Sequence, residues 1–596
     1  MNENSNFLFA IVLSLGVLIG WQYFVIAPKE AAQREALAQQ AATEQSLAPL
    51  AADPLALNAP GAPQLDQAEP EAAKRTSLKN APRVSIESDQ MKGSISLLGA
   101  RFDDISLTQY PVSLKEGSPS VTLLRPETEP KSWQAQFGWQ ALPGAELDLP
   151  NDQSQWTLKN GATLAPDNPV TLEYKSKSGL VFTRTISVDH EFMFTIDDQV
   201  QNTSASTVTL FPYGQIIRTG RPKTSNLFVL HEGPIGLLGE EGLQELDYAD
   251  LLEDGPTKIT SQGGWLGFTD KYWATALIPP QDATVNARFV ARGANQPENE
   301  VFKSDYILDG RAIAPGQISA VSSRLFAGAK VVDVIDNYAN QGIDRFDLLI
   351  DWGWFYFLTK PMFAALQFFY HLLGNYGLSI LLVTVIIKLL FFPLASRSYV
   401  TMAKMKRVQP EMVRIREVYK DDRQAQQQQL MKLYKDEKLN PLAGCLPVLL
   451  QIPVFFALYK VLFVTLDMRH QPFFGWVQDL AAPDPTTIFN LFGLIPWDPP
   501  SFLMLGVWPL LMGITMFVQM QLNPPPPDPV QAMIFKYMPI FFTFLLAGFP
   551  AGLVIYWAWN NFLSILQQSY IMQRNGAEIE LLNNIGLRKK QPEESK

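Results

Sequence analysis

The chain has 596 residues, a formal net charge of −10 and a single cysteine, Cys445. Its length exceeds that of one compact domain. Its acidic balance argues against nucleic acid as a general partner, because phosphate binding needs a surplus of Lys and Arg. One cysteine excludes a disulfide within the chain. The four histidines are scattered without metal-ligand spacing, so we expect neither a metal nor a cofactor.

The N-terminal part begins with an apolar run at 7–26, long enough to cross a bilayer core of about 30 Å. A cleaved signal peptide is the alternative, but this run is longer than a usual signal core and no Lys or Arg precedes it. We therefore expect an uncleaved anchor at 1–27. The next segment, 28–79, is rich in Ala, Gln, Glu and Pro and lacks the large apolar residues of a folded core, which predicts a flexible linker.

Residues 80–340 have a different texture. Short β-prone runs alternate with Gly, Pro, Asn and Asp, as at 93–98, 182–188, 192–197 and 207–211. This spacing predicts an all-β sandwich. The last part of the segment, 330–340, has a helical pattern.

The second half of the chain is strongly apolar. The segment at 341–375 is dense in aromatic residues, which suits an amphipathic helix in the membrane interface. Transmembrane helices are predicted at 376–395, 442–464, 502–521, 530–550 and 551–573, with a helical hairpin at 396–441, loops at 465–501 and 522–529, and a basic tail at 574–596. With the anchor, the fold class is a polytopic α-helical membrane protein of six transmembrane helices that carries a large all-β sandwich.

The loops predict the orientation. Residues 397–438 contain 11 Lys and Arg against 6 Asp and Glu, which places the hairpin in the cytoplasm by the positive-inside rule. The basic tail agrees. Both termini are then cytoplasmic, and the β domain lies on the other side. The cations Lys29 and Arg34, just after the first run, disagree, but long translocated domains often override such weak biases.

Lys388 is the most informative single residue, because it lies inside the apolar segment 376–395. A charge in mid-span costs about 2.5–3.5 kcal/mol, so such a side chain is normally directed at a cavity or a partner. Thr384 lies one turn earlier on the same face. The alternative is that Lys388 extends its long side chain to the cytoplasmic interface.

Other apolar segments also carry polar residues. Gln451 lies in the third, while Tyr556, Asn560 and Gln567 share one helical face of the sixth. Each alone is more often a packing contact between helices. Together with Lys388 they could line one hydrated groove. The sequence has no acidic residue in mid-span to pair with this lysine.

The cytoplasmic segment has a heptad-like pattern. A helical seam is predicted by its apolar residues Met405, Val408, Met412, Ile415 and Tyr419. The exposed basic side chains Arg407, Arg414 and Arg416 could meet an acidic partner such as ribosomal RNA. A merely solvated basic face is equally compatible with the pattern.

Motifs for covalent chemistry are absent from the sequence. There is no G-x-x-x-x-G-K-[ST] phosphate loop, no G-x-S-x-G nucleophile elbow and no H-E-x-x-H zinc motif. We therefore expect no enzyme. A transporter or channel is the main alternative, although the core shows neither a repeat between its halves nor an in-span carboxylate.

Several motifs together resemble a known family. They are the run 381–394 with its in-span cation, Met402-Ala-Lys-Met405, the Asn-Pro-Leu-Ala-Gly-Cys sequence at 440–445, Gln451-Ile-Pro453 and Phe549-Pro-Ala-Gly-Leu-Val554. By these motifs, 346–572 resembles the YidC/Oxa/Alb membrane protein insertases, and the long β domain is similar to that of Gram-negative bacterial YidC. The sandwich of these relatives is itself similar to sugar mutarotases, but a fold alone does not give a function, and the sequence shows no persuasive acid–base pair.

The resemblance implies a fold, a function and partners. It implies a five-helix core with a hydrophilic groove, open to cytoplasm and lipid, that inserts and folds integral membrane proteins without nucleotide hydrolysis. The expected partners are nascent membrane proteins, the Sec translocon, the ribosome and targeting factors, and the lipid bilayer. The expected location is the bacterial inner membrane, with a periplasmic β domain.

The resemblance also implies site residues. The groove residues are Lys388, Thr384, Gln451, Tyr556, Trp557 and Asn560, and the ribosome or partner contacts are Arg407, Arg414, Arg416, Arg588, Lys589 and Lys590. The sequence departs from the family at two of these positions. Most relatives have arginine where this chain has Lys388, and the pair Tyr556-Trp557 is often Tyr-Tyr.

Overall fold

The computed structural model describes residues 80–575, apart from 225–229, 240–241, 294–295, 354, 438–445, 494, 496, 498, 501–503 and 523–528. The predicted anchor at 1–27, the linker at 28–79, the motif at 440–445 and the basic residues Arg588, Lys589 and Lys590 lie outside the described residues.

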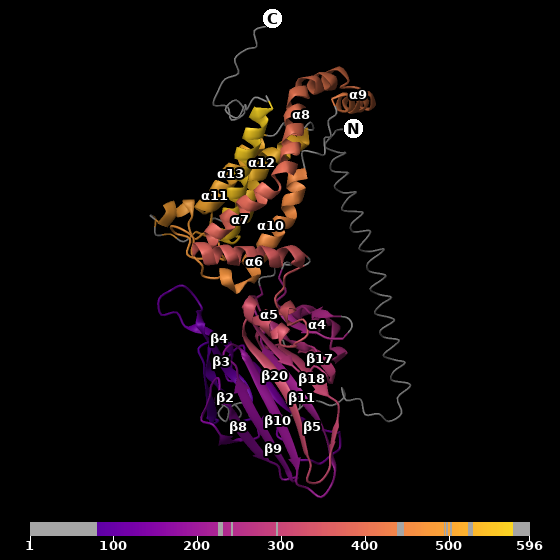
Figure 1. The fold of residues 1–596 in the computed structure, drawn as a ribbon, viewed down its shortest axis with the longest axis vertical. Helices are drawn as coiled ribbons and strands as arrows, with labels where there is room; N and C mark the ends of the chain where they lie inside the picture. Colours follow the sequence, from indigo (N-terminus) through magenta and orange to yellow (C-terminus); the bar gives the residue numbers. More distant parts are fainter. Residues whose placement is uncertain are drawn as a thin grey trace. The chain divides into compact units, whose positions relative to one another are not determined.

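The first sheet of the β domain runs in the order β14-β17-β18-β11-β5-β3-β2-β1-β7, with β19 beside β11 and β4 beside β3. Figure 1 labels β2, β3, β4, β5, β11, β17 and β18 of this sheet. Its strands are β1 (Arg83–Glu87), β2 (Met91–Ser96), β3 (Arg101–Pro111), β4 (Ser120–Leu124), β5 (Trp133–Ala141), β7 (Thr163–Leu164), β11 (Val208–Thr219), β14 (Thr257–Gln262), β17 (Thr284–Arg292), β18 (Val301–Leu308) and β19 (Arg311–Ile313). Most neighbours are antiparallel, and β1 and β7 are parallel.

The second sheet runs in the order β13-β12-β15-β16-β20-β10-β9-β8-β6. Its strands are β6 (Thr157–Asn160), β8 (Val170–Lys175), β9 (Leu180–Val188), β10 (Met193–Asn202), β12 (Gly233–Leu237), β13 (Leu243–Glu245), β15 (Trp265–Thr269), β16 (Trp273–Ile278) and β20 (Ile318–Ala329). The predicted all-β sandwich is confirmed.

Alternating side chains form the core between the sheets. Strand β9 buries every second residue along its whole length, because successive side chains of a strand point to opposite faces. Phe102 of the first sheet meets Phe194 of the second edge to face, with ring centroids 5.3 Å apart. Buried Arg184 donates to both carboxylate oxygens of Asp198 at 2.6 and 2.7 Å, and these paired bonds offset the loss of hydration of two buried charges.

Short helices accompany the sandwich. They are α4 (Tyr248–Asp254), η3 (Pro297–Asn299), α5 (Val332–Asn340) and η4 (Phe346–Leu349). Helix α5 follows β20 directly and joins the core of the sandwich through Ile335 and Tyr338. The Tyr338 hydroxyl donates to Asp189 Oδ2 at 2.6 Å, which fixes α5 against the turn before β10.

The rest of the described chain is helical. Its elements are α6 (Tyr356–Leu373), α7 (Tyr376–Leu390), α8 (Phe392–Val418), α9 (Arg423–Asp436), α10 (Leu446–Val464), η6 (Leu466–Met468), η7 (Ile488–Gly493), α11 (Val507–Leu522), α12 (Pro529–Leu546) and α13 (Ala551–Arg574) (Figure 1). Helix α6 exposes Tyr356, Phe357 and Phe368 and buries Met362 and Phe363, so it is amphipathic.

Local sequence explains where helices end. Helix α6 stops at Gly374, whose φ of 66° suits glycine because it has no Cβ to clash. Asn375 then caps α7, with its side-chain oxygen accepting from the Leu378 amide at 3.0 Å. Helix α8 begins directly after Phe391 with Pro393 in its first turn, a position that needs no amide hydrogen. Asp422 caps α9 by accepting from the Ala425 amide at 3.0 Å.

The helices differ in their ability to cross a bilayer. Among the described helices, none alone is both long and apolar enough, whereas α7 and α8 together have the length and composition as a pair bent by 67°. The six-span topology stays a prediction.

Helix α13 is the centre of the helical part. It packs against α7, α8, α10 and α11, while α12 packs against α11. Met512 and Met516 of α11 form an apolar cluster with Leu546 of α12 and Val554 of α13. Because α13 contacts several other helices, polar side chains on its inward faces can meet those of its neighbours.

Candidate functional site

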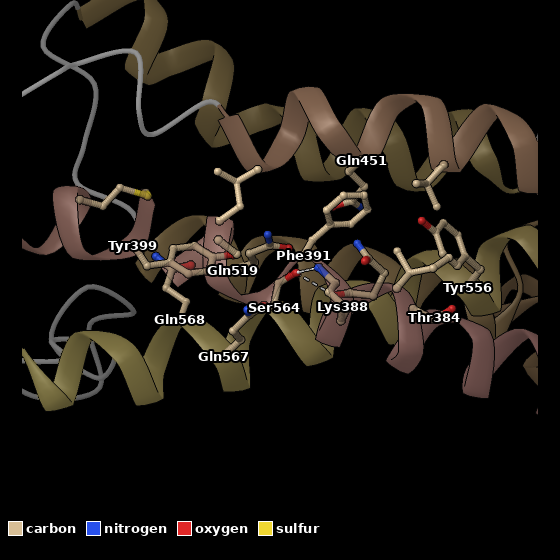
Figure 2. Close-up of a pocket in the computed structure, with 16 residues that line it drawn as sticks. Thr384, Lys388, Phe391, Tyr399, Gln451, Gln519, Tyr556, Ser564, Gln567 and Gln568 are labelled. Carbon is tan, nitrogen blue, oxygen red and sulfur yellow. Dashed lines mark hydrogen bonds between the residues drawn. The ribbon is translucent and has the colours of Figure 1, made fainter. Parts of the chain in front are cut away.

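A cavity of about 100 Å³ lies among the helices, large enough for several water molecules. Figure 2 shows its polar side chains converging from several helices. The lining is Thr384, Ile387 and Lys388 of α7, Phe391 after it, Leu394, Ala395, Tyr399 and Met402 of α8, Gln451 and Val454 of α10, Gln519 of α11, and Tyr556, Asn560, Ser564, Gln567 and Gln568 of α13. We call this cavity the groove.

Lys388 carries the charge of the groove. Its Nζ donates to Ser564 Oγ of α13 at 2.7 Å, drawn as a dashed line in Figure 2. The described lining contains no Asp or Glu, so the positive charge is not neutralised there. The sequence allowed Lys388 either to face a cavity or to extend to the cytoplasmic interface. In the structure it faces the cavity.

One face of α13 supplies the opposite wall. Tyr556, Asn560 and Ser564 follow one another at intervals of four residues, so they lie above each other on the helix. Tyr556 is 2% exposed and lies at the cavity with Gln451 of α10. The Trp559 indole donates to the Leu381 carbonyl at 3.2 Å and holds α13 beside α7. The polar face of α13 thus lies beside both α10 and α7.

The groove offers hydrogen-bond donors in excess. Within the described residues, Asn560 Nδ2 and Gln567 Nε2 are buried without a hydrogen-bond partner. A buried, unpaired polar group costs free energy, which a ligand carrying an acceptor would recover. With Lys388, these donors suit carbonyl or carboxylate oxygens.

The remaining predicted groove residue on α7 has a more local role. Thr384 lines the groove, but its hydroxyl donates to the Ile380 carbonyl of its own helix at 2.6 Å. A hydroxyl that donates within its helix can still accept from a visiting donor.

In the part of the chain that the structure describes, no three His, Cys, Asp or Glu side chains are grouped to hold a metal.

Trp557 requires a correction, because the structure does not place it in the groove. Its ring packs against Phe455 of α10 and Phe542 of α12, at centroid distances of 4.7 and 5.7 Å. Adjacent residues of an α-helix point about 100° apart, and Trp557 is directed towards α10 and α12 while Tyr556 lines the cavity. Trp557 joins helices and does not line the site.

Several lining residues escaped the sequence reasoning, and Ser564 and Tyr399 are the two that bear on Lys388. Ser564 extends the face of Tyr556 and Asn560 by one more turn, so the same periodicity would have found it. Tyr399 offered no such signal. It falls in the segment predicted as cytoplasmic hairpin, and only the packing of α8 along α13 brings it to the groove.

The predicted basic contacts lie on α8. Arg407 donates to the Asn575 carbonyl at the end of α13, and exposed Arg414 donates to Glu411 at 2.9 Å, three residues earlier on the same helix. Arg416 is half-buried. Two of the predicted seam residues, Met412 and Ile415, are buried. The arginines are therefore not all equally available to a partner.

Comparison with known proteins covers nearly the whole chain. The family model described as YidC periplasmic domain matches residues 83–365, and that described as 60Kd inner membrane protein matches residues 368–578. A protein named membrane protein insertase YidC from Methylorubrum extorquens is 51% identical over 98% of this chain and 97% of its own length. A protein of the same name from Methylobacterium radiotolerans is 52% identical over the same shares.

A solved structure described as an active YidC insertase covers 83% of this chain and 96% of its own length, with 16% identity and a TM-score of 0.33. That structural similarity is too low to support an argument, and the assignment rests on the sequence relatives and the two family models. The chain belongs to the YidC family of membrane protein insertases.

Proposed function

We propose that this protein inserts integral membrane proteins into the bacterial inner membrane and that its groove receives the polar flank of the incoming segment. Its close relatives are named membrane protein insertases, a function without covalent chemistry. The observation that carries the role of the groove is its donor set. Lys388 and the unpaired Asn560 Nδ2 face a cavity whose described lining has no acidic residue.

The physical task is to move polar groups through an apolar layer. A charge at the centre of a bilayer costs about 2.5–3.5 kcal/mol on the insertion scale. A groove that holds water, a cation and free donors shortens the dry path and attracts carboxylate and carbonyl groups. The apolar segment of the substrate then enters lipid, and the burial of its apolar surface drives the step to completion.

The outer helices suit contact with lipid. Helix α11 exposes Ile514, and α12 exposes Ile540, Phe541 and Phe544, all more than half accessible. Large apolar side chains exposed together on neighbouring helices are typical of a membrane or partner contact. We propose that α7, α10, α11, α12 and α13 span the membrane with the first apolar run, that both termini are cytoplasmic and that the β domain is periplasmic.

Partners follow from the same family resemblance. We propose that nascent chains arrive from the ribosome and targeting factors at the cytoplasmic helices α8 and α9. We also propose that some substrates are inserted with the Sec translocon and others by this protein alone.

Site-specific photocrosslinking tests the groove. A photoreactive residue at Asn560, inside the groove, is compared with one at Tyr570, which lies on the same helix and is 57% exposed. A stalled nascent membrane protein with an acidic N-terminal tail is the target. We expect the tail to crosslink from position 560 and not from position 570. Equal crosslinking from both positions, or from neither, contradicts the proposed role of the groove.

A further inference from the structure

The Ser564 hydroxyl makes two hydrogen bonds, one to each of two helices. It is 1% exposed, accepts from Lys388 Nζ of α7 at 2.7 Å and donates to the Asn560 carbonyl of its own helix at 2.8 Å. The Tyr399 side chain of α8 lines the same cavity and lies close enough to Ser564 to interact with it. A serine hydroxyl has one hydrogen and two lone pairs. Its single hydrogen goes to the Asn560 carbonyl, so Lys388 occupies one of the two lone pairs.

This arrangement gives the groove cation a defined position. A lysine side chain has four flexible carbons, and its charged end needs an acceptor to stay in one place. Within the described part of the chain, Ser564 Oγ is the one hydrogen-bond acceptor of Lys388 Nζ. Without the Ser564 oxygen, the charge of Lys388 would remain in the groove, but it would no longer be held beside residue 564 of α13.

Tyr399 connects the same point to the cytoplasmic helices. Helix α8 leaves α7 at a 67° bend and continues to Val418, beyond the groove. Along α8, Tyr399, Ala403 and Arg407 are spaced by four residues and all face α13.

Their contacts on α13 follow in the same order. Tyr399 lies beside Ser564 at the cavity and packs with Ile571, Ala403 packs with Met572, and Arg407 donates to the Asn575 carbonyl. A movement of α8 away from α13 must therefore separate Tyr399 from Ser564.

We propose that Ser564 is a positioning residue that holds Lys388 at the groove wall and that Tyr399 couples this position to α8. The inference rests on the proposed function, because it assigns a regulator to the same groove. A partner can bind the hairpin of α8 and α9 and shift α8. This shift changes the position of Lys388 at the groove wall. The cytoplasmic helices thereby influence how the groove receives an acidic segment.

The test uses the full chain in vesicles of phosphatidylethanolamine and phosphatidylglycerol. Two substrates share one apolar segment and differ only in an acidic or a neutral translocated tail, and insertion is read by protease protection of the tail. For Ser564→Ala we expect about fivefold less insertion of the acidic tail, with the neutral tail unchanged. Ser564→Thr should restore insertion, because threonine keeps the hydroxyl and its bond to the carbonyl four residues earlier. Tyr399→Phe should reduce insertion of the acidic tail by a smaller factor.

A matched control is Ser379→Ala. Ser379 is fully buried on α7 and donates to the Asn375 carbonyl at 3.0 Å, the same local bond as that of Ser564, but it does not line the groove. Ser379→Ala should leave the ratio of acidic-tail to neutral-tail insertion unchanged. If Ser564 has only a structural role, Ser564→Ala will lower insertion of the acidic and the neutral tail equally. That result overturns the positioning role.

The remaining outcomes separate the two proposals. If Lys388→Ala lowers insertion of the acidic tail while Ser564→Ala does not, the positioning role is wrong and the proposed function stands. If Ser564→Ala has its expected effect and Tyr399→Phe equals wild type, the coupling to α8 is wrong. If the wild-type chain inserts neither substrate, the proposed function fails, and this inference fails with it.

Discussion

Gly513 of α11 lies directly against Thr543 of α12, with no room between them for another carbon atom. A Cβ at position 513 would overlap Thr543 Oγ1, whose hydrogen goes to the Pro539 carbonyl at 2.7 Å. Small residues let membrane helices approach closely enough for van der Waals packing to hold them together. Since α12 packs mainly against α11, this contact helps to hold α12 in place.

The close approach predicts a destabilising substitution and its suppressor. Gly513→Ala should lower the free energy of unfolding by about 1–3 kcal/mol, because the added methyl group forces the helices apart. Thr543→Ala removes the overlapping oxygen and should restore much of the loss in the double variant. Thermal unfolding of the purified protein in detergent measures both. A double variant no more stable than Gly513→Ala alone would show that the contact is not the cause.

The groove cation predicts a charge-dependent effect on insertion. Lys388→Arg should retain activity, because the positive charge remains even though arginine presents it as a planar fork. Lys388→Ala should impair substrates with acidic translocated tails several-fold and spare neutral ones. Protease protection of the tail in vesicles measures this effect. If wild type and Lys388→Ala insert the acidic tail equally, the charge of Lys388 has no role in insertion.

The β domain is predicted to be dispensable for insertion, since none of the groove residues belongs to it. The structure shows where to cut. A deletion of 84–300 leaves β18, β19 and β20 without most of their partners, and unpaired strand edges promote aggregation. A deletion of 84–329 removes both sheets. This variant should accumulate to a higher level than the 84–300 deletion, and it should support growth in place of the full chain. Loss of growth with the stably produced 84–329 deletion would assign the domain an essential role.

The basic residues of α8 are predicted to bind the ribosome. Reversing Arg407, Arg414 and Arg416 to glutamate should weaken co-sedimentation with ribosomes and make the residual binding less sensitive to salt.

A charge-matched control reverses three exposed lysines of the β domain, Lys92, Lys115 and Lys177. It should bind ribosomes like wild type. Binding by the arginine variant that equals wild type at every salt concentration would make this face a solvated surface. The ribosome contact would then shift to Arg588, Lys589 and Lys590.

A buried lysine predicts a pH dependence of stability in the β domain. Lys330 is 1% exposed, and burial lowers its pKa to about 8, although Asp270, Asp351 and Glu232 act in the opposite direction. Its Nζ donates to Thr269 Oγ1 at 2.8 Å. Between pH 8 and the ordinary lysine pKa of 10.5, the unfolded chain binds more protons than the folded one, so stability rises with pH.

The comparison of wild type with Lys330→Met isolates this contribution. The stability of the wild type relative to the variant should increase by roughly 3 kcal/mol over that pH range. Denaturant unfolding of the full chain, followed through the β domain, measures the difference. A difference that does not change between pH 8 and 10.5 would show that Lys330 titrates as it does in the unfolded chain.

Several features of this protein follow from the sequence alone, because they depend on local periodicity. The alternation in β9 is visible as Leu180, Phe182, Arg184, Ile186 and Val188, all of which are buried. The polar face of α13 is visible in the spacing of Tyr556 and Asn560. A charge inside an apolar run needs no structure to be noticed, and the motifs around it are sufficient to indicate the family.

Other features depend on the tertiary structure, because no local pattern encodes which segments meet. Lys388 and Ser564 are separated by 176 residues and meet only when α7 packs on α13. Tyr399 reads as part of a cytoplasmic hairpin until the bend after α7 lays α8 along the groove. Trp557 reads as a groove residue beside Tyr556 until its ring is seen between Phe455 and Phe542. Periodicity determines which face of a helix is polar, and only the packing of several helices determines what that face meets.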